Sequence, residues 1–296
     1  MVRHYVGTVD DTRFTASERF AKHSDGYRRL ELIGHTTSPA AVHMGLGLVD
    51  LQPAGHLMPV MHAFEKGFYV LRGTVVVAMA GRAHLLGRNH YGVIPKATTY
   101  SYYNPSNEPA RILEMMAPQP KPLDSGFDDT IFVSDSPLVR EAAVPDLTDP
   151  RIKHLGRFDE ASLPSGGQIS GAGARSSSIH GVSIKEFVDR MLGAQHLSMF
   201  LVQFQPGGMG TQHDHPHEES YFILSGKAEA VLDGESYLVE PGDYVWTGVG
   251  CFHSFATVGE EPVRWLETQA PLPADFEAFR FHREWAPLSP LAGRQP

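Results

Sequence analysis

The chain has very little cysteine, no excess of positive charge and no long apolar run. Cys251 is the only cysteine among 296 residues, which excludes internal disulfides and any cysteine-based metal cluster. The formal net charge is -9, which disfavours broad electrostatic attraction to nucleic acid or to an anionic membrane. No segment approaches the roughly 20 apolar residues needed to span a bilayer, and the first residues lack the apolar run of a signal peptide. We therefore expect a cytoplasmic globular protein.

From Met44 onward the sequence consists of short runs rich in valine, tyrosine and phenylalanine. Glycine and proline interrupt these runs at close intervals. This pattern is typical of an all-β barrel or sandwich.

An internal repeat divides this β-rich region. The matching segments are LVDLQPAG at 48–55 with LVQFQPGG at 201–208, FYVLRG at 68–73 with YFILSG at 221–226, and ARILEMMAP at 110–118 with VRWLETQAP at 263–271. The offsets 201 − 48, 221 − 68 and 263 − 110 all equal 153. Because the register stays constant over the whole region, the repeat predicts that the same β domain occurs twice.

The repeat sets the expected domain boundaries. We expect an N-terminal arm at 1–40, a first barrel at 41–120, a connecting segment at 121–195, a second barrel at 196–272 and a tail at 273–296. Within the connection, the Gly/Ser-rich stretch 162–178 has the composition of an exposed linker, and a mobile loop near an active site is the alternative. Residues 179–193 are expected to hold a short helix before the next strand.

The second repeat carries four potential metal ligands. His213 and His215 lie two apart on an expected strand and so share one face, and Glu219 keeps the same parity. His253 follows after a glycine-rich turn. Imidazole nitrogens with one carboxylate oxygen suit a divalent first-row transition metal. His217 has the same parity, and we place it at the rim of the site, although it could act as a ligand if the strand bends.

Subtracting 153 tests the first repeat for the same site. The four ligands map onto Val60, His62, Lys66 and Tyr100. A lysine stands where a carboxylate would be, and the neighbouring Glu65 would face the other way on a strand. We therefore expect no metal in the first barrel, which would be a structural half or a dimerisation surface. Cys251 is expected to be a small buried packing residue.

The stretch 207–257 resembles the cupin superfamily. The first cupin motif, G-x5-H-x-H-x3,4-E-x6-G, is matched at Gly207, His213, His215, Glu219 and Gly226. The second motif, G-x5-P-x-G-x2-H-x3-N, is matched at Gly242, Gly250 and His253, with Gly248 and Thr257 in place of its proline and asparagine. The resemblance implies an all-β bicupin, two tandem jelly-roll barrels, with its metal in the second. A small barrel turns alternate residues inward, so the ligands can share one interior face. Ligands on neighbouring strands would then surround the metal on three sides and leave coordination positions open for water or substrate. A metal site that serves conformation alone is the alternative.

Over roughly residues 40–275 the chain is also similar to the ureidoglycine aminohydrolases, manganese enzymes of purine and allantoin breakdown once described as glyoxylate-induced proteins. The likeness lies in length, in two-barrel layout and in the run FYVLRGTVVVAMAGRAHLLGRNHYGVIP. It implies a hydrolase that releases ammonia from a small polar, carboxylate-bearing substrate. One divalent metal per chain is expected, with manganese first and iron, nickel, copper or zinc as alternatives. That family uses a Glu-x-His-x3-His ligand set with a late glutamine, whereas this chain has the ordinary cupin set.

Four residues are expected to contact the substrate. Tyr221 shares the parity of Glu219, while Glu267 and Gln269 lie on the last strand of the repeat. Phe255 and Gln269 occupy the places of a tyrosine and a lysine in the aminohydrolase family. Glu267 recurs as Glu114 in the first repeat, which weakens a catalytic interpretation, so no catalytic residue is assigned.

Two other functions remain open. Cupin dioxygenases acting on diketones or flavonols also use three histidines and a glutamate, with iron, copper or nickel. An apolar pocket for such substrates, or simply core, would come from Phe222, Trp246, Phe252, Phe255 and Trp265. The third possibility is a non-enzymatic sugar- or metabolite-binding cupin. In every case the expected partner is a small molecule, and the chain is expected to form a homo-oligomer.

Overall fold

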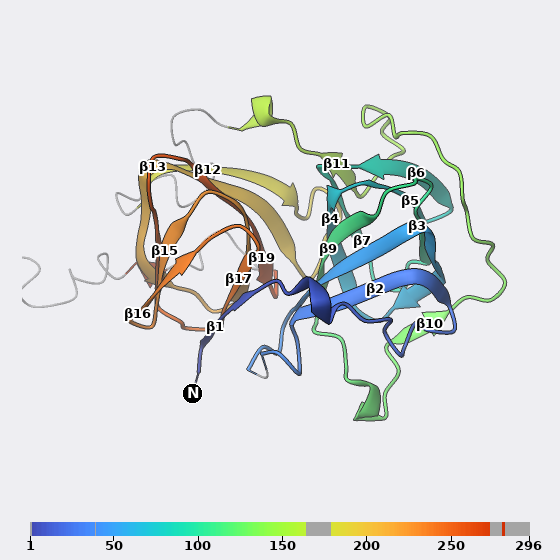
Figure 1. Ribbon diagram of the computed structural model, residues 1–296, viewed down its shortest axis with the longest axis horizontal. Coiled ribbons are helices and arrows are strands. Elements are labelled where there is room, and N and C mark those ends of the chain that lie inside the picture. Colours follow the sequence, from blue (N-terminus) through green and yellow to red (C-terminus); the bar gives the residue numbers. More distant parts are fainter. Residues whose placement is uncertain (1, 39, 164–178, 273–279, 282–296) are drawn as a thin grey trace, which may run out of the picture. The chain divides into compact units, whose positions relative to one another are not determined.

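The computed structural model describes residues 2–38, 40–163, 179–272 and 280–281, and these form two compact units (Figure 1). The N-terminal barrel comprises Asp10–Glu160 and Phe187–Met199. The C-terminal barrel takes its described residues from Met1–Val9, Ala161–Glu186 and Phe200–Pro296. Most of the Gly/Ser-rich stretch and most of the tail lie outside the described residues.

Each unit is built on one sheet. The sheet of the N-terminal barrel contains β2 (Ser24–Ile33), β3 (Gly45–His62), β4 (Glu65–Arg72), β5 (Thr74–Met79), β6 (Arg82–Gly87), β7 (His90–Ile94), β8 (Tyr100–Tyr103), β9 (Ala110–Ala117), β10 (Thr130–Phe132) and β11 (Leu155–Arg157). The sheet of the C-terminal barrel contains β1 (His4–Thr8), β12 (Ile179–Val188), β13 (Ser198–Asp214), β14 (Glu218–Ser225), β15 (Ala228–Leu232), β16 (Glu235–Val239), β17 (Asp243–Thr247), β18 (His253–Thr257), β19 (Val263–Ala270) and β20 (Arg280–Phe281). The helices are short 3-10 turns: η1 (Asp11–Arg13), η2 (Leu123–Ser125) and η3 (Glu160–Ser162).

The two sheets have the same topology, which confirms the all-β prediction of two tandem jelly-roll barrels. Their strand orders are β11-β7-β4-β9-β3-β8-β5-β6 and β1-β17-β14-β19-β13-β18-β15-β16. Apart from the outermost β11 and β1, each strand occupies the place of its counterpart in the repeat. Inward side chains of each sheet form a separate apolar core.

A glycine ends the strand that carries the carboxylate position in each repeat. Gly226 follows β14 with a φ of 70°, and Gly73 follows β4 with a φ of 72°. A Cβ at Gly226 would lie 2.3 Å from the carbonyl oxygen of Pro262, and one at Gly73 would lie 2.7 Å from the Cα of Ala110. Only glycine combines this left-handed backbone with so close an approach of the neighbouring strand.

The prediction of a short helix within 179–193 is wrong, because residues 179–188 form strand β12. Val182 belongs to the core of the C-terminal barrel and Ile184 packs against it, so the segment gains more by adding to the sheet than by forming a short helix. The residues that follow make a turn, in which Leu192 N donates to Asp189 Oδ1 at 2.8 Å.

Residues 1–40, expected to form an arm, provide one strand to each sheet. β1 pairs antiparallel with β17, with His4 opposite Thr247. β2 pairs antiparallel with β3.

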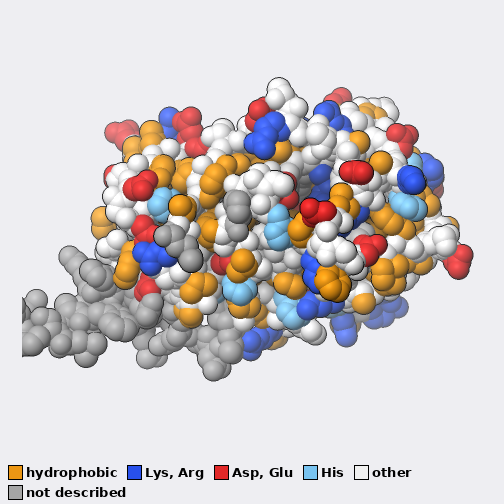
Figure 2. Space-filling model, turned by 90° about the horizontal axis from the view of Figure 1, so that it is seen from below, with side chains coloured by type: hydrophobic (Ala, Val, Ile, Leu, Met, Phe, Trp, Pro, Cys, Tyr) orange, Lys and Arg blue, Asp and Glu red, His pale blue; other side chains and the backbone are white. Residues whose placement is uncertain are grey.

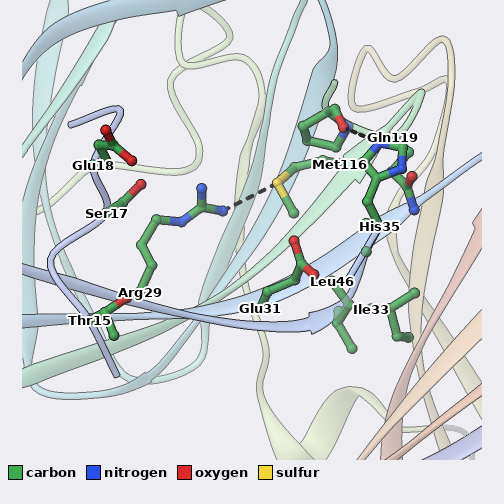
Figure 3. Close-up of a pocket in the computed structure, with 13 residues that line it drawn as sticks. Thr15, Ser17, Glu18, Arg29, Glu31, Ile33, His35, Leu46, Met116 and Gln119 are labelled. Atoms are coloured by element: carbon green, nitrogen blue, oxygen red, sulfur yellow. Dashed lines mark hydrogen bonds between the residues drawn. The ribbon is translucent and has the colours of Figure 1, made fainter. Parts of the chain in front are cut away.

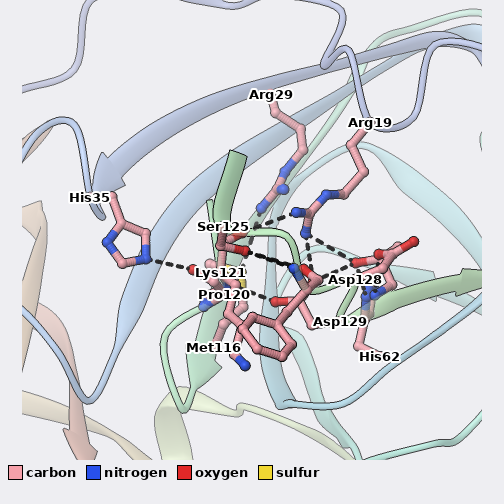
Figure 4. A network of polar contacts seen from close by, with 12 residues as sticks. Arg19, Arg29, His35, His62, Met116, Pro120, Lys121, Ser125, Asp128 and Asp129 are labelled. Atoms are coloured by element: carbon pink, nitrogen blue, oxygen red, sulfur yellow. Dashed lines mark hydrogen bonds and ion pairs between the residues drawn. The ribbon is translucent and has the colours of Figure 1, made fainter. Parts of the chain in front are cut away.

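A polar network fastens the segment after β9 to the N-terminal barrel (Figure 4). Asp129 Oδ1 accepts from Arg19 Nη1 at 2.6 Å and from Thr130 Oγ1 at 3.0 Å, while its Oδ2 accepts from Lys121 N at 2.6 Å. Thr130 Oγ1 also lies 3.0 Å from His62 Nδ1. The network therefore reaches His62, the side chain that corresponds to the candidate metal ligand His215 in the other repeat.

Glu65 anchors residues 195–197 to the same barrel, and its replacement by glutamine is expected to destabilise the fold by about 2–3 kcal/mol. The carboxylate, 1% exposed, accepts from the backbone N–H groups of Gln195, His196 and Leu197 at 2.9, 2.9 and 3.1 Å. A glutamine would turn an NH2 group toward these donors. Urea unfolding followed by circular dichroism measures the loss. The exposed Glu108→Gln is the matched control, and equal midpoints for the two variants would contradict the anchoring role.

On the face shown in Figure 2, acidic and basic side chains are interspersed with apolar ones. Within the part of the chain that the structure describes, no helix has the length and apolar character needed to cross a membrane.

Candidate metal centre

The candidate ligands come from the ends of three strands. His213 lies at the end of β13, Glu219 at the start of β14 and His253 at the start of β18. β13 ends at Asp214, so His215 lies in the connection to β14 rather than on the strand predicted for it. Parity along one strand is therefore not what brings His215 to the site. The turn that includes His217 places it there.

Glu219 is the centre of the cluster. Its Oε2 lies 2.6 Å from His215 Nε2 and 3.4 Å from His253 Nε2. Tyr221 donates its hydroxyl proton to the same oxygen, and Gln269 Nε2 donates to Oε1 at 2.7 Å. His215, Glu219 and His253 are buried, and one ligand atom of each lies within 4.8 Å of the others, close enough for one ion to be shared.

The other ring nitrogen of each histidine contacts a backbone carbonyl. Nδ1 of His215 lies 2.8 Å from the carbonyl oxygen of His217. Nδ1 of His253 lies 2.9 Å from the carbonyl oxygen of Cys251, and Nδ1 of His213 lies 2.9 Å from that of Thr211. A carbonyl oxygen only accepts, so Nδ1 carries a proton, and in the neutral form of each ring Nε2 presents a lone pair. Among the described residues His253 Nε2 is buried without a hydrogen-bond partner. Two imidazole lone pairs facing a carboxylate oxygen need a cation, so the residues present fit a divalent metal.

His213 and His217 lie beside this group. The ring of His213 is 4.3 Å from that of His253 and 6.2 Å from that of His215, centroid to centroid. Burial, then the neighbouring His253, lowers the pKa of His213 to about 3, so this imidazole is neutral near pH 7. The ring of His217 stacks on that of His215 at 3.9 Å, and its Nε2 lies 3.4 Å from Glu219 Oε1. Which of the two supplies a fourth ligand stays a prediction, with His213 as the choice.

The pKa values of two carboxyl groups in the site are shifted in opposite directions. Burial alone would raise the pKa of Glu219, but the positive charge of a protonated His215 and hydrogen bonds from the protonated forms of the neighbouring histidines hold the pKa of this carboxyl well below its usual range. Burial, together with the charge on Glu219, raises the pKa of Glu267 well above its usual range. The environments of the two carboxyl groups thus differ in the way that separates an acid from a base in an active site.

The four predicted substrate residues are all buried in this region. Tyr221 and Gln269 both donate to Glu219, while Glu267 Oε2 accepts from Trp265 Nε1 at 2.9 Å. The ring of Phe255 packs 4.7 Å from that of Tyr221. Their contact with a substrate stays a prediction.

The aromatic candidates divide between the core around the site and other positions. Phe255 and Trp265 lie in the core of the C-terminal barrel. Trp246 is buried elsewhere, and its Nε1 donates to Glu218 Oε2 at 3.3 Å. Cys251 is buried as expected, and burial raises the pKa of its thiol to about 12. Its backbone carbonyl contacts His253 Nδ1.

Comparison with known proteins gives the same two-part pattern. The cupin domain family matches residues 47–116 and again residues 200–268. The chain is a bicupin. It belongs to the cupin superfamily, with one family domain in each barrel.

Curated relatives match this bicupin over a single domain's length. The pectin degradation protein KdgF of Dickeya dadantii is 31% identical over 81 residues, which is 27% of the bicupin and 73% of the relative. The polyketide synthase protein CurC of Streptomyces cyaneus is 29% identical over 82 residues, 27% of the bicupin and about half, 53%, of the relative.

Solved structures resemble both barrels together. A glyoxylate-induced protein of Pseudomonas aeruginosa has a TM-score of 0.65 at 17% identity, covering 94% of the bicupin and 92% of that chain. A variant of Bacillus subtilis oxalate decarboxylase has a TM-score of 0.64 at 18% identity, covering 98% and 82%. Salicylate 1,2-dioxygenase of Pseudoaminobacter salicylatoxidans has a TM-score of 0.65 at 16% identity, covering 83% and 74%. At these identities the likeness shows the fold alone.

In the N-terminal barrel of the bicupin, Lys66 occupies the position that Glu219 has in the C-terminal barrel. Lys66 Nζ donates to Glu114 Oε1 at 2.8 Å and to the Tyr100 hydroxyl at 2.6 Å. That hydroxyl lies 2.9 Å from His62 Nε2. An ammonium group thus provides positive charge in this barrel, in the place where the C-terminal barrel has the carboxylate of Glu219.

Proposed function

We propose that this bicupin is a metal-dependent enzyme that acts on a small carboxylate-bearing substrate. The observation that carries the proposal is the convergence of imidazole Nε2 atoms on Glu219, with each Nδ1 held by a backbone carbonyl. His215, Glu219 and His253 would hold one divalent first-row transition metal, with His213 as the fourth ligand. When bound, such a metal would polarise the substrate and lower the pKa of coordinated water.

The first candidate reaction is a hydrolysis that releases ammonia, of the ureidoglycine aminohydrolase type with manganese. Support comes from the protic groups of the site and from the fold shared with the glyoxylate-induced protein. Gln269 and Tyr221 hold the Glu219 carboxylate in place by donating to both of its oxygens. Glu267, whose pKa is raised by burial and by the charge on Glu219, would hold the proton that a leaving amine requires.

The second candidate is an O2-dependent reaction of the dioxygenase type. It is favoured by the set of three histidines and one glutamate and by the rings of Phe255 and Trp265, which pack 5.2 Å apart next to Tyr221. The shared fold with salicylate 1,2-dioxygenase adds to it.

Elemental analysis of the purified chain, coupled to two assays, separates the candidates. Manganese together with ammonia release from ureidoglycine is the result expected for the hydrolase. Oxygen uptake with a diketone or flavonol, together with iron, nickel or copper, would replace it by the dioxygenase. A protein that holds no metal and binds metabolites unchanged after chelation would refute both, and would leave a non-enzymatic binding role. Light scattering on the same sample tests the proposed homo-oligomer.

A further inference from the structure

The N-terminal barrel contains a cavity of about 280 Å³, just below the range of roughly 300–1,000 Å³ that is typical of small-molecule pockets. Its walls come from β2, β3 and β9, from residues 15–18 before β2, and from residues just after β2 and β9. Figure 3 shows Arg29 and Glu31 from β2 in this cavity, with Met116, His35 and Gln119 around it. None of the proposed metal ligands lines it.

Two glycines of β3 lie at the cavity or beside Arg29. Gly45 lines the cavity, and at Gly47 an added Cβ would lie 3.0 Å from the carbonyl oxygen of Leu30 and 3.7 Å from Arg29 Nη2. The repeat places Phe200 opposite Gly47, since 200 − 47 is 153, and Phe200 is buried in the core of the C-terminal barrel. The N-terminal repeat therefore has no side chain beside Arg29 at a position that a large ring fills in the C-terminal repeat.

Arg29 is likewise particular to this repeat. Gly26 packs against Gln52 and Gly55 as Gly181 packs against Gln205 and Gly208. This match aligns β2 with β12 at an offset of 155, so that Arg29 corresponds to Ile184. Where the C-terminal barrel has apolar Ile184 and Phe200, the N-terminal barrel has a cation and an open space.

Two polar groups that line the cavity have unused hydrogen-bonding capacity. Arg29 Nη2 has only long contacts, 3.4 Å to Glu114 Oε2 and 3.5 Å to Met116 sulfur, and its Nε is buried without a partner among the described residues. Gln119 Nε2 donates to the carbonyl of Met44 at 3.0 Å, while its Oε1 is also buried without a partner in the described part of the chain. The cavity thus offers a cationic donor and a neutral acceptor.

Neighbouring charges limit which ligands the cavity can bind. Glu114 lies 2.8 Å from Lys66 Nζ and 3.4 Å from Arg29 Nη2, so a single carboxylate faces two cations and leaves a net positive charge for another anion. Glu31 and Glu18 line the exposed side of the cavity, where they would repel a second negative charge and attract a positive one.

We propose that this cavity is a second ligand site, which binds a small amino acid in its zwitterionic form. The carboxylate pairs with the guanidinium of Arg29, because a planar guanidinium matches a carboxylate with two parallel hydrogen bonds. The ammonium group donates to Gln119 Oε1.

Calorimetric titration of the full-length, metal-loaded protein with glycine, L-alanine, L-aspartate, acetate, methylamine and phosphate tests the proposal. Glycine or alanine should bind at least about tenfold more tightly than the other four. Equal binding of phosphate or aspartate, or no binding of either neutral amino acid, would overturn it.

Variants locate the site. Arg29→Gln should weaken glycine binding by roughly tenfold or more, while Arg28→Gln on the neighbouring exposed position should not. Gln119→Leu should reduce the preference for glycine over acetate without removing acetate binding, a change that general damage to the barrel would not produce. Binding should persist in His253→Ala, which separates this site from the proposed metal centre. Loss of binding in His253→Ala, or full binding in Arg29→Gln, would sink the assignment.

Discussion

Substitution of His253 by alanine is expected to remove the metal from the C-terminal barrel and to abolish activity. His253 Nε2 faces Glu219 Oε2 at 3.4 Å from the buried start of β18, and its ring orientation is fixed by the carbonyl of Cys251. Loss of a group that merely supports a metal ligand typically costs 10–100-fold in affinity, so loss of a ligand should cost more. His215→Ala should behave in the same way. The metal content of purified protein and the competition of each variant with a chelator measure the effect.

Two controls make this result specific. His180→Ala removes an exposed histidine of β12 and should leave the metal content unchanged. Lys66→Ala should also leave it unchanged, because the proposed site lies in the other barrel. Metal loss in Lys66→Ala, or retention of a full equivalent in His253→Ala, would refute the single-site proposal.

Replacement of Lys66 by methionine is expected to destabilise the N-terminal barrel by about 3–5 kcal/mol. The ammonium group is 2% exposed and its partner Glu114 is fully buried. Without Lys66, the carboxylate keeps only the Tyr102 hydroxyl at 3.2 Å and the long contact to Arg29. The double variant Lys66→Met/Glu114→Gln should recover most of the loss, because it removes the uncompensated charge. Denaturant unfolding measures both, and a single variant as stable as the parent would contradict the pairing.

The difference in unfolding free energy between the parent and Lys66→Met is expected to increase with pH. Burial, opposed by Glu114, lowers the pKa of Lys66 from 10.5 to about 8. Between these two pH values the unfolded chain binds more protons at this residue than the folded chain. The contribution of Lys66 to the unfolding free energy therefore rises with pH across this window, and the cost of burying the charge is fully present below it. The stability gap between the parent and Lys66→Met should widen from pH 8 to pH 10, whereas the exposed Lys96→Met should show no such trend.

The fold could be predicted from the sequence because a duplication repeats its own signal. A constant offset of 153 places β4 and β14, or β9 and β19, at the same position of two sheets. The structure of the segment at 179–193 was harder to predict, because the segment lies between the clear repeats. Its strand is stabilised by pairing with β13, which local sequence preference does not show.

The candidate metal site was predictable in residue type and only in part in geometry. Motif spacing selected His215, Glu219 and His253, whose ligand atoms lie together in the structure, whereas the end of β13 at Asp214 depends on tertiary structure. The carbonyl groups that orient the rings have no signature in side-chain patterns. The pairing of Lys66 with Glu114 joins residues 48 positions apart, and only the sheet register brings them together.

The position of β1 has a consequence for how the protein folds. This strand precedes the whole N-terminal barrel in the sequence, yet it pairs with β17, so that His4 meets Thr247 across 243 intervening steps of the chain. At synthesis rates of about 5–20 residues per second, β1 must wait roughly 12–50 s for its partner. Such non-local pairing is slow. We therefore expect the C-terminal barrel to close last, with docking of β1 as its final step.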